Sequence, residues 1–268
     1  MTVSLKKPAY WIISNKENQI LLKKNKSGYQ LPLFINPPLK IVEQTIIHNL
    51  PALKENHFYA YLSETTHLNK EEYQWFTIRE SYYWLPAAVY KQVGKAIQLI
   101  HWDINSRFCS FCSTPLKQVD TIEKVCPHCN REYFPPISTA ILVLIRKKDQ
   151  ILLAESHNFK GKFHSLIAGF LETGETLEEC VQREVWEETR LKIKNITYFG
   201  NQPWPFPSGL MVGFIADYDS GDIILQEEEL KSAKFYTKEN LPTLPQKLSL
   251  ARRMIDWWLE HTSKLESS

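Results

Sequence analysis

The residues best suited to chemistry are three carboxylates in the second half of the chain. Glu184, Glu187 and Glu188 stand at i, i+3 and i+4, so on a helix their side chains project to one side. Like charges held this close repel each other unless a cation neutralises them. Carboxylate oxygens are the ligands that Mg²⁺ and Mn²⁺ prefer. The spacing therefore favours a divalent-cation site, and the structural alternative is the solvated face of a glutamate-rich helix.

The residues before these glutamates favour the metal site over the solvated face. Gly169 opens a loop that Glu175 closes, and Thr176 and Glu179 form a capping-box pattern, which predicts that a helix starts there. Arg183 adjoins the carboxylates and adds a positive charge among them. A generic surface helix does not require a glycine loop or a partnered arginine at these positions.

The whole stretch resembles the Nudix box, a loop–helix–loop motif of about 23 residues. Its matching positions in this sequence are Gly169, Glu175, Arg183, Glu184, Glu187 and Glu188. The resemblance implies a Nudix fold, which is a mixed β-sheet between helices. It further implies that Arg183, Glu184, Glu187 and Glu188 are catalytic, with Arg183 orienting a carboxylate.

The resemblance also implies a set of Mg²⁺ or Mn²⁺ ligands. Glu184 and Glu188 would be the main ones, joined by the backbone carbonyl of Ala168 and by a later acidic residue. We choose Glu229 for that residue, with Glu227 and Glu228 as near alternatives.

Arg190 stands where the Nudix box usually has a glycine. Glycine there favours a left-handed helix end, which costs arginine roughly 1 kcal/mol. We therefore expect the helix exit to differ and the ligands before it to be intact.

Four of the five cysteines form two close pairs, Cys109-Ser-Phe-Cys112 and Cys126-Pro-His-Cys129. Two such knuckles supply four thiolates that close a tetrahedron around Zn²⁺, and a closed shell of this kind is structural. His128 lies inside a knuckle and is a competing ligand, although a solvent-facing histidine is the favoured interpretation. Cys180 stands alone in the predicted helix and is expected to be a buried packing residue.

Downstream of the box, Gln202-Pro-Trp-Pro-Phe-Pro207 alternates prolines with two aromatic residues. Such a segment is predicted to be stiff and extended, and Trp204 and Phe206 could form a stacking surface for a flat ring. The alternative is a proline-rich linker whose aromatic rings pack into the core.

This segment resembles the motif that follows the box in the NADH pyrophosphatase branch of the Nudix family, with Asn201 and Gly209 in place of its serines. The same branch carries a zinc ribbon before the Nudix domain. By this resemblance the substrate-binding residues would be Gln202, Pro203, Trp204, Pro205, Phe206, Pro207 and Ala251. Arg79 would reach the substrate from the N-terminal domain, although a surface arginine is an equal alternative.

The resemblance implies that the chain hydrolyses the diphosphate bond of NADH or NAD⁺ to nicotinamide mononucleotide and AMP, and that it is a homodimer. Removal of NAD caps from RNA by the same chemistry is an alternative. Two further alternatives are a nucleotide or nucleic-acid sensor with a retired active site and an enzyme that sanitises the nucleotide pool. The sequence does not decide between NADH, NAD⁺, ADP-ribose and NAD-capped RNA.

The bulk properties are those of an ordinary globular protein. The chain has 268 residues, of which 43% are hydrophobic and 23% are charged, and its formal net charge is +2. A charge this small does not indicate bulk attraction to nucleic acid or membranes. No apolar run is long enough for a membrane span, and the N-terminus does not resemble a signal peptide, so we expect a cytoplasmic protein with no membrane partner.

The elements that must position these residues indicate an α+β protein. Residues 1–105 are predicted to form a β-rich domain with one helix from Ala87 to His101, residues 106–134 a zinc ribbon, and residues 137–264 the Nudix domain. Predicted strands of the last domain are Thr139–Arg146, Gln150–Ala154, Phe163–Ala168, Ile193–Phe199, Leu210–Tyr218 and Lys234–Tyr236. Its predicted helices are Leu177–Thr189 and Leu248–His261.

Overall fold

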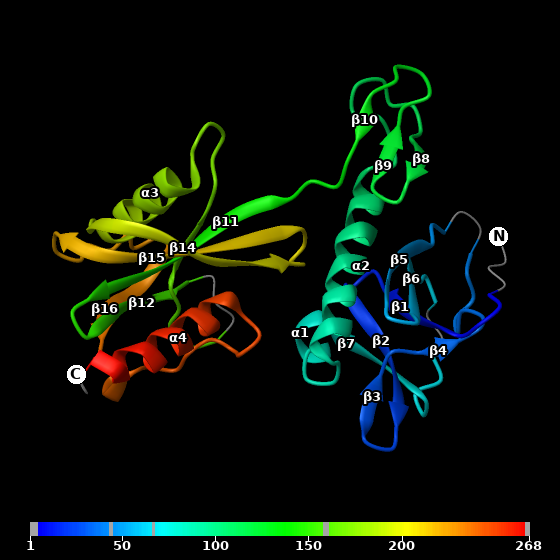
Figure 1. Ribbon diagram of the computed structural model, residues 1–268. Coiled ribbons are helices and arrows are strands. Elements are labelled where there is room, and N and C mark those ends of the chain that lie inside the picture. Colours follow the sequence, from blue (N-terminus) through cyan, green and yellow to red (C-terminus); the bar gives the residue numbers. More distant parts are fainter. Residues whose placement is uncertain (1–4, 43–44, 66–67, 158–160, 266–268) are drawn as a thin grey trace. The chain divides into compact units, whose positions relative to one another are not determined.

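A computed structural model describes residues 5–42, 45–65, 68–157 and 161–265 (Figure 1). The chain forms two units. The first comprises Met1–Pro136 and Pro205–Ser208, and the second comprises Ile137–Trp204 and Gly209–Ser268. The chain therefore leaves the second unit for four residues and then returns to it. Among the described residues, no helix has the length and hydropathy that a membrane span requires.

The first unit contains a seven-stranded sheet in the order β3-β2-β1-β6-β5, with β4 paired to β1 and β7 paired to β2. The pair β1–β6 is parallel and the other pairs are antiparallel. The strands are β1 (Ala9–Ser14), β2 (Gln19–Asn25), β3 (Gly28–Gln30), β4 (Leu33–Phe34), β5 (His48–Leu53), β6 (Asn56–Leu62) and β7 (Tyr73–Thr77).

Two helices follow this sheet, α1 (Ile78–Ser81) and α2 (Ala87–Asn105). The buried face of α2, with Val93, Ile97 and Ile100, packs into one core cluster with Ile12 and Phe58 of the sheet. Apolar residues spaced three and four apart produce such a face on a helix.

The ribbon that follows α2 is a small antiparallel sheet in the order β10-β9-β8. Its strands are β8 (Lys117–Asp120), β9 (Glu123–Val125) and β10 (Glu132–Tyr133). Most of its side chains are exposed, whereas Cys109 and Cys126 are 2% and 0% exposed. A segment with so few buried apolar groups needs another source of stability, and the cysteines are placed to supply it.

The second unit contains a six-stranded sheet in the order β14-β15-β11-β12-β16, with β13 paired to β11. The central pair β11–β15 is parallel and the other pairs are antiparallel. Its elements are β11 (Ser138–Lys147), β12 (Gln150–Ser156), β13 (Ile167–Phe170), α3 (Leu177–Thr189), β14 (Lys192–Trp204), β15 (Gly209–Ser220), β16 (Leu230–Tyr236), the 3₁₀ turn η1 (Lys238–Asn240) and α4 (Leu250–Leu265).

Helices α3 and α4 cover opposite faces of this sheet (Figure 1). Alternate residues of β11 explain the two layers. Ile141 and Val143 pack in the cluster of α3, whereas Leu142 and Leu144 pack in the cluster of α4. Because successive side chains of a strand point to opposite faces, a strand buried on both faces is apolar throughout.

The α+β class expected from the sequence is confirmed, and most predicted elements lie within a few residues of their observed bounds. One strand was placed too early: Phe163–Ala168 was expected, whereas β13 covers Ile167–Phe170, and Ser165 makes only an isolated bridge to Ala154. The expected strand ended at Ala168 because Gly169 was expected to open the loop before the helix. The structure instead pairs Gly169 with Ile141.

Candidate active site and zinc ribbon

Helix α3 begins where its capping residues predict. The Thr176 hydroxyl accepts from the Glu179 backbone N–H at 3.2 Å, and the Glu179 carboxylate accepts from the Thr176 N–H at 2.8 Å. The helix buries Cys180, Val181 and Val185 against the sheet. The glutamates therefore project from a helix whose start and inner face are both fixed.

The end of α3 corrects the expectation that Arg190 would change the helix exit. Arg190 has φ 59° and ψ 14°, the left-handed conformation that glycine would favour, and its N–H donates to the Trp186 carbonyl at 2.9 Å. Its guanidinium lies 5.6 Å from the Trp186 ring centroid. This cation–π contact offsets part of the cost of the left-handed backbone.

Glu184 lies directly over Gly169 of β13. A Cβ added at Gly169 would be 1.8 Å from the carboxyl carbon of Glu184, well inside van der Waals contact. Any other residue at 169 would therefore displace the Glu184 side chain. This close approach explains why a glycine is needed in the middle of a paired strand.

Arg183 connects the loop to the carboxylates. Its Nε and Nη2 donate to the two oxygens of Glu175 at 2.5 and 3.0 Å, and its Nη2 also donates to the Phe170 carbonyl at 3.0 Å. Its Nη1 donates to Glu184 at 2.9 Å and to Glu187 at 3.0 Å. Arg183 thus holds three carboxylates at once, a geometry that suits the planar fork of a guanidinium.

The carboxylates differ in how their pKa values are shifted. Hydrogen bonds from Arg183 lower the pKa of Glu175 to about 2, so this group is ionised throughout the physiological range. Burial, together with the charges of Glu184 and Glu229, raises the pKa of Glu188 to about 8. Burial also raises the pKa of Glu184, against the opposing effect of Arg183. Glu188 and Glu184 are 4% and 9% exposed.

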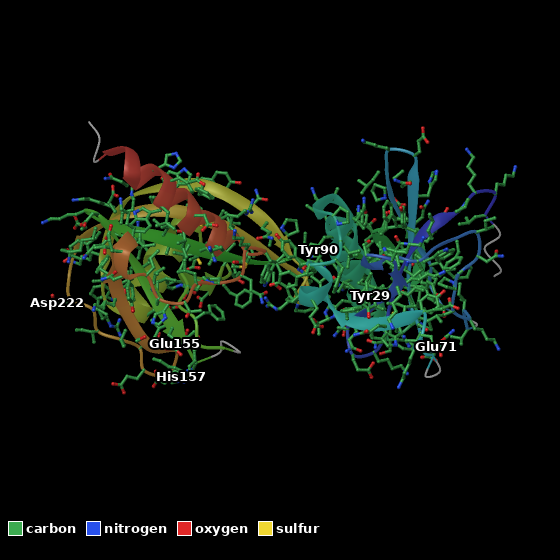
Figure 2. All side chains as sticks on the ribbon, turned by 90° about the horizontal axis from the view of Figure 1, so that it is seen from below. Tyr29, Glu71, Tyr90, Glu155, His157 and Asp222 are labelled. Carbon is green, nitrogen blue, oxygen red and sulfur yellow. The ribbon has the colours of Figure 1, made fainter. Side chains whose placement is uncertain are left out.

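Glu229 is brought to the glutamates of α3 by the loop before β16. The backbone N–H groups of Ile224 and Gln226 donate to the last carbonyls of α3, those of Thr189 and Glu188, at 3.0 and 3.1 Å. The carbonyl of Glu229 accepts from the His157 N–H at 3.0 Å. Figure 2 shows His157 and Glu155 close together at the end of β12.

The charge of Glu229 raises the pKa values of both Glu184 and Glu188. This proximity favours Glu229 over Glu227 and Glu228 as the fourth acidic residue, and the assignment stays a prediction. A buried group of carboxylates whose ionisation is opposed by burial and by its own members fits a divalent cation, which would supply the missing positive charge. Within the described residues, the oxygens of these carboxylates do not gather as closely as the sulfurs of the ribbon do.

Four thiols gather in the ribbon. The sulfurs of Cys109, Cys112, Cys126 and Cys129 lie within 4.8 Å of one another. The separations of Cys109–Cys129, Cys112–Cys126 and Cys112–Cys129 are 3.6, 3.5 and 3.7 Å. Four Zn–S bonds of about 2.3 Å in a tetrahedron require S···S separations of about 3.8 Å. The four cysteines therefore fit structural Zn²⁺, and their number leaves no position for a reacting ligand.

The two knuckles have matching backbones. Ser113 N–H donates to the Cys109 carbonyl and Asn130 N–H donates to the Cys126 carbonyl, both at 2.9 Å. Ser113 and Asn130 both have φ 57°. The competing ligand His128 is not part of the cysteine group found among the described residues. Cys180 is fully buried in the core of the second unit, as expected.

The proline-rich segment is not extended throughout, which corrects that expectation. Gln202, Pro203 and Trp204 end β14, residues 205–208 form a turn, and Gly209 begins β15. Trp204 belongs to the second unit, whereas Phe206 packs against the core of the first. The packed ring of Phe206 matches the linker alternative, which pattern alone could not separate from a stacking surface.

The remaining predicted substrate residues lie in two places. In the first unit, the Arg79 guanidinium is 4.3 Å from the centroid of the Phe206 ring. In the second unit, Gln202 donates to the Leu248 carbonyl at 2.9 Å, while its side-chain oxygen is buried without a hydrogen-bond partner. Ala251 is 5% exposed in the first turn of α4.

Pro203 lies near the end of β14, whereas Pro205 and Pro207 lie in the turn. Pro205 is buried and the other two prolines are exposed. The sequence missed one contact of the site, the Phe170 carbonyl that accepts from Arg183. A backbone acceptor leaves no residue-type signal, so only the fold reveals it.

Comparisons with known proteins agree with this geometry. Residues 135–258 match the family model of the NUDIX domain, and residues 104–134 match that of the NADH pyrophosphatase zinc ribbon domain. The chain is 42% identical over 195 residues to the "NAD-capped RNA hydrolase NudC" of Chromobacterium violaceum, covering 72% of this chain and 74% of that protein.

A protein of the same name from Salmonella schwarzengrund is 42% identical over 171 residues, and the alignment covers 63% of this chain and 66% of that protein. Among solved structures, a NUDIX hydrolase from Nitrosomonas europaea is 20% identical with a TM-score of 0.49, covering 57% of this chain and 91% of that one.

Proposed function

Because the chain belongs to the Nudix hydrolase family and carries the zinc ribbon of NADH pyrophosphatases, we propose that it hydrolyses the diphosphate bond of NADH or NAD⁺. The products are AMP and nicotinamide mononucleotide, which NADH releases in its reduced form. One observation carries the proposal: Glu184 and Glu188 are buried, and the charges of Glu187 and Glu229 raise the pKa of each. A divalent cation bound together with a diphosphate would neutralise the negative charge of this cluster.

Mg²⁺ or Mn²⁺ would be held by Glu184, Glu188 and Glu229, together with the backbone carbonyl of Ala168. When bound, the ion supplies a Lewis acid that neutralises charge on the diphosphate oxygens. Ala168 precedes Gly169 in β13, where it pairs with Leu142, so its backbone position is fixed by the sheet. The donor set consists of oxygens alone, which is the preference of these hard cations.

The protein's own residues position the reaction. Arg183 fixes Glu184 and Glu187, and its bidentate bond to Glu175 fixes Arg183 in turn. A glutamate of the cluster accepts the proton of the attacking water. Among the three clustered glutamates of α3, Glu187 is the most exposed, with a side chain that is 47% exposed. Water attacks phosphorus in line with the leaving phosphate, so positioning and charge neutralisation matter more than a protein nucleophile.

Substrate recognition is assigned to the proline-rich segment and its neighbours. Trp204 offers a flat ring to the nicotinamide or the base. The buried, unpartnered oxygen of Gln202 is a further acceptor on the same segment. Ala251 contributes a backbone contact to the nucleotide from the start of α4.

Removal of NAD caps from RNA is the second candidate, because the cap contains the same diphosphate and the most similar relatives compared above are named for that activity. The other two alternatives have less support. A sensor with a retired active site would not need to keep the interactions among Arg183, Glu184, Glu187 and Glu188. An enzyme that sanitises the nucleotide pool would release pyrophosphate from a triphosphate. We also expect a cytoplasmic homodimer whose ribbon carries one structural Zn²⁺.

Product analysis tests the proposal. The purified protein is incubated with NADH, NAD⁺, ADP-ribose, a nucleoside triphosphate and NAD-capped RNA, each with Mg²⁺ or Mn²⁺, and the products are separated by liquid chromatography. AMP is expected from both dinucleotides, together with nicotinamide mononucleotide from NAD⁺ and its reduced form from NADH.

Glu188→Gln is the matched variant, since it keeps the size of the side chain and removes its charge. We expect at least about a 100-fold loss of kcat with the fold and the zinc content retained, given that even supporting residues of metal sites contribute about 10–100-fold. Full activity of this variant would refute the assignment.

A further inference from the structure

The loop that joins β15 to β16, residues 221–229, carries Glu229, the residue chosen as the fourth acidic ligand. Its residues are all described and lie outside the helices and strands. Figure 2 labels Asp222 near the start of the loop, and it labels His157, whose N–H donates to the Glu229 carbonyl at the other end at 3.0 Å. Because no regular element contains Glu229, contacts with the rest of the unit must fix its position.

The exit of α3 supplies such contacts. The last four carbonyl groups of a helix have no partner within the helix itself. Two of them, those of Glu188 and Thr189, accept from the backbone N–H groups of Gln226 and Ile224 at 3.1 and 3.0 Å. The loop therefore runs along the end of the helix that carries the other proposed ligands.

The side chains of the same stretch are anchored in the core. Ile223 and Leu225 pack against the core cluster of α3, whereas Ile224 between them is 63% exposed. This alternation of buried and exposed side chains is that of an extended chain. The stretch is thus held by apolar packing as well as by its backbone hydrogen bonds.

Gly221 allows the chain to enter this path. Its φ is 102°, and an added Cβ would lie 2.9 Å from the Arg190 carbonyl oxygen and 3.5 Å from the Leu191 Cα. Its own carbonyl accepts from the Tyr218 hydroxyl at 2.7 Å. A residue with a side chain would meet both an unfavourable backbone conformation and a backbone clash, so the start of the loop requires glycine.

Gln226 connects two proposed metal ligands through its backbone alone. Its N–H donates to the Glu188 carbonyl at 3.1 Å, and its carbonyl accepts from the N–H groups of Glu229 and Leu230, both at 3.0 Å. Glu229 is therefore two hydrogen bonds away from the backbone of Glu188. The turn between Gln226 and Glu229 is closed by these bonds, so a displacement of Gln226 would displace Glu229 as well.

The two carboxylates need such a connection because they repel each other. The charge of Glu229 is close enough to raise the pKa of Glu188. Glu188 is fixed on a buried helix face, whereas Glu229 is exposed and belongs to a loop. Without the backbone bonds, repulsion between like charges would favour the movement of Glu229 into solvent.

We propose that Gln226 is a positioning residue of the metal site, whose backbone N–H and carbonyl set the position of Glu229 against Glu188. The inference rests on the proposed function in taking these two glutamates as cation ligands. Groups that orient metal ligands contribute about 10–100-fold to metal affinity or activity. A bond that only capped α3 would stabilise the fold and leave the metal affinity of the folded protein unchanged.

The test compares two variants of one position. Gln226→Pro removes the backbone N–H and keeps the carbonyl, whereas Gln226→Ala keeps both and removes only the side chain. Leu225 lies in extended chain, the conformation that a residue before proline prefers. An ester linkage at position 226, which replaces the N–H by oxygen, makes the same comparison if the proline variant does not fold. Circular dichroism and thermal melts verify folding.

The Mn²⁺ affinity is measured by isothermal titration calorimetry without substrate. We expect Gln226→Pro to bind Mn²⁺ at least about tenfold more weakly than Gln226→Ala. Gly221→Ala, which disturbs the start of the loop and removes no donor, should weaken binding in the same direction. In steady-state kinetics with NADH, excess Mn²⁺ should recover most of the kcat of the proline variant, with KM for NADH nearly unchanged.

A double-mutant cycle shows whether Gln226 acts through Glu229. In the background of Glu229→Gln, the further change Gln226→Pro should have little effect on Mn²⁺ affinity, because the ligand that it positions is already lost. Fully additive effects would overturn the inference, as would equal Mn²⁺ affinities of the proline and alanine variants.

The two proposals fail in different ways. A wild-type protein that hydrolyses NADH, with equal Mn²⁺ affinities in the proline and alanine variants, contradicts only the role of Gln226. A wild-type protein whose Mn²⁺ affinity depends on Gln226 and Glu229 as expected, but which hydrolyses no dinucleotide, contradicts only the proposed function.

Discussion

The carboxyl group of Glu184 occupies the space that a side chain at Gly169 would need. An added Cβ would lie 1.8 Å from the Glu184 carboxyl carbon. The strand glycine and the helix glutamate, 15 positions apart in the sequence, are therefore one structural feature. It links the close packing of β13 and α3 to the placement of a proposed metal ligand.

The first prediction follows from this contact. Gly169→Ala should push the flexible end of Glu184 away from its neighbours and lower kcat for NADH about 10–100-fold, the usual effect of disturbing a group that orients metal ligands. Gly200→Ala is the matched control, because no atom lies within 4 Å of a Cβ at that position. Equal activity of the two variants would show that the position of Glu184 does not matter.

The second prediction concerns Arg183. Arg183→Lys keeps the charge and removes the fork that holds Glu175, Glu184 and Glu187 together. We expect kcat to fall about 10–100-fold with a smaller change in KM, because the carboxylates lose their orientation rather than the substrate its contacts. Steady-state kinetics with NADH measure both quantities. A rise in KM at constant kcat would instead place Arg183 in substrate binding.

The third prediction is a pH dependence of stability. The pKa of Glu175 is lowered from 4.5 to about 2 in the folded protein, because Arg183 donates to its carboxylate. A group with a lowered folded pKa stabilises the protein above its unfolded pKa, and that contribution is lost as the pH falls through the folded pKa. The difference in free energy of unfolding between wild type and Glu175→Gln should therefore be constant above about pH 5.

Between about pH 4.5 and pH 2 the same difference should shrink. Urea unfolding at a series of pH values measures it, and Asp256→Asn, which removes a partner of Arg252, serves as a variant without a link to Glu175. A difference that stays constant down to pH 2 would mean that the bond between Arg183 and Glu175 does not form in solution.

The fourth prediction concerns the ribbon. Cys126→Ser should remove the bound zinc, because a three-thiolate site cannot close the tetrahedron. Structural zinc contributes about 10–16 kcal/mol of apparent binding free energy in zinc-finger peptides, so the ribbon should unfold. The core of α3 and α4 lies in the other unit and should keep its thermal transition.

Zinc content by mass spectrometry and differential scanning calorimetry provide the measurements. Cys180→Ser removes a thiol outside the ribbon and should leave the zinc content at one per chain. A full complement of zinc in Cys126→Ser would contradict the four-cysteine site.

The sequence predicted local features well wherever neighbouring residues decide them. Helix α3 starts at its capping box, and the two knuckles fold alike because each spaces two cysteines by two residues. Spacing alone also placed Glu184 and Glu188 on one side of the helix. Such features depend on a few consecutive residues, so pattern is sufficient for them.

Features that depend on distant contacts were harder to predict. The turn at residues 205–208 is set by the pairing of β14 with β15, and Phe206 packs against a core that forms from other parts of the chain. The strand at Gly169 contradicts the ordinary preference of glycine because Glu184 needs the space. In each case the long-range partner outweighs local propensity.

The central claim is that Glu184, Glu188 and Glu229 bind a catalytic divalent cation. Anomalous diffraction from crystals soaked in Mn²⁺ tests it most directly, with crystals of Glu188→Gln as the reference. The account predicts a strong anomalous peak within bonding distance of Glu184 and Glu188 in the wild type and its loss or marked weakening in the variant. Wild-type crystals that cleave NADH in solution but show no peak among these carboxylates would contradict the account.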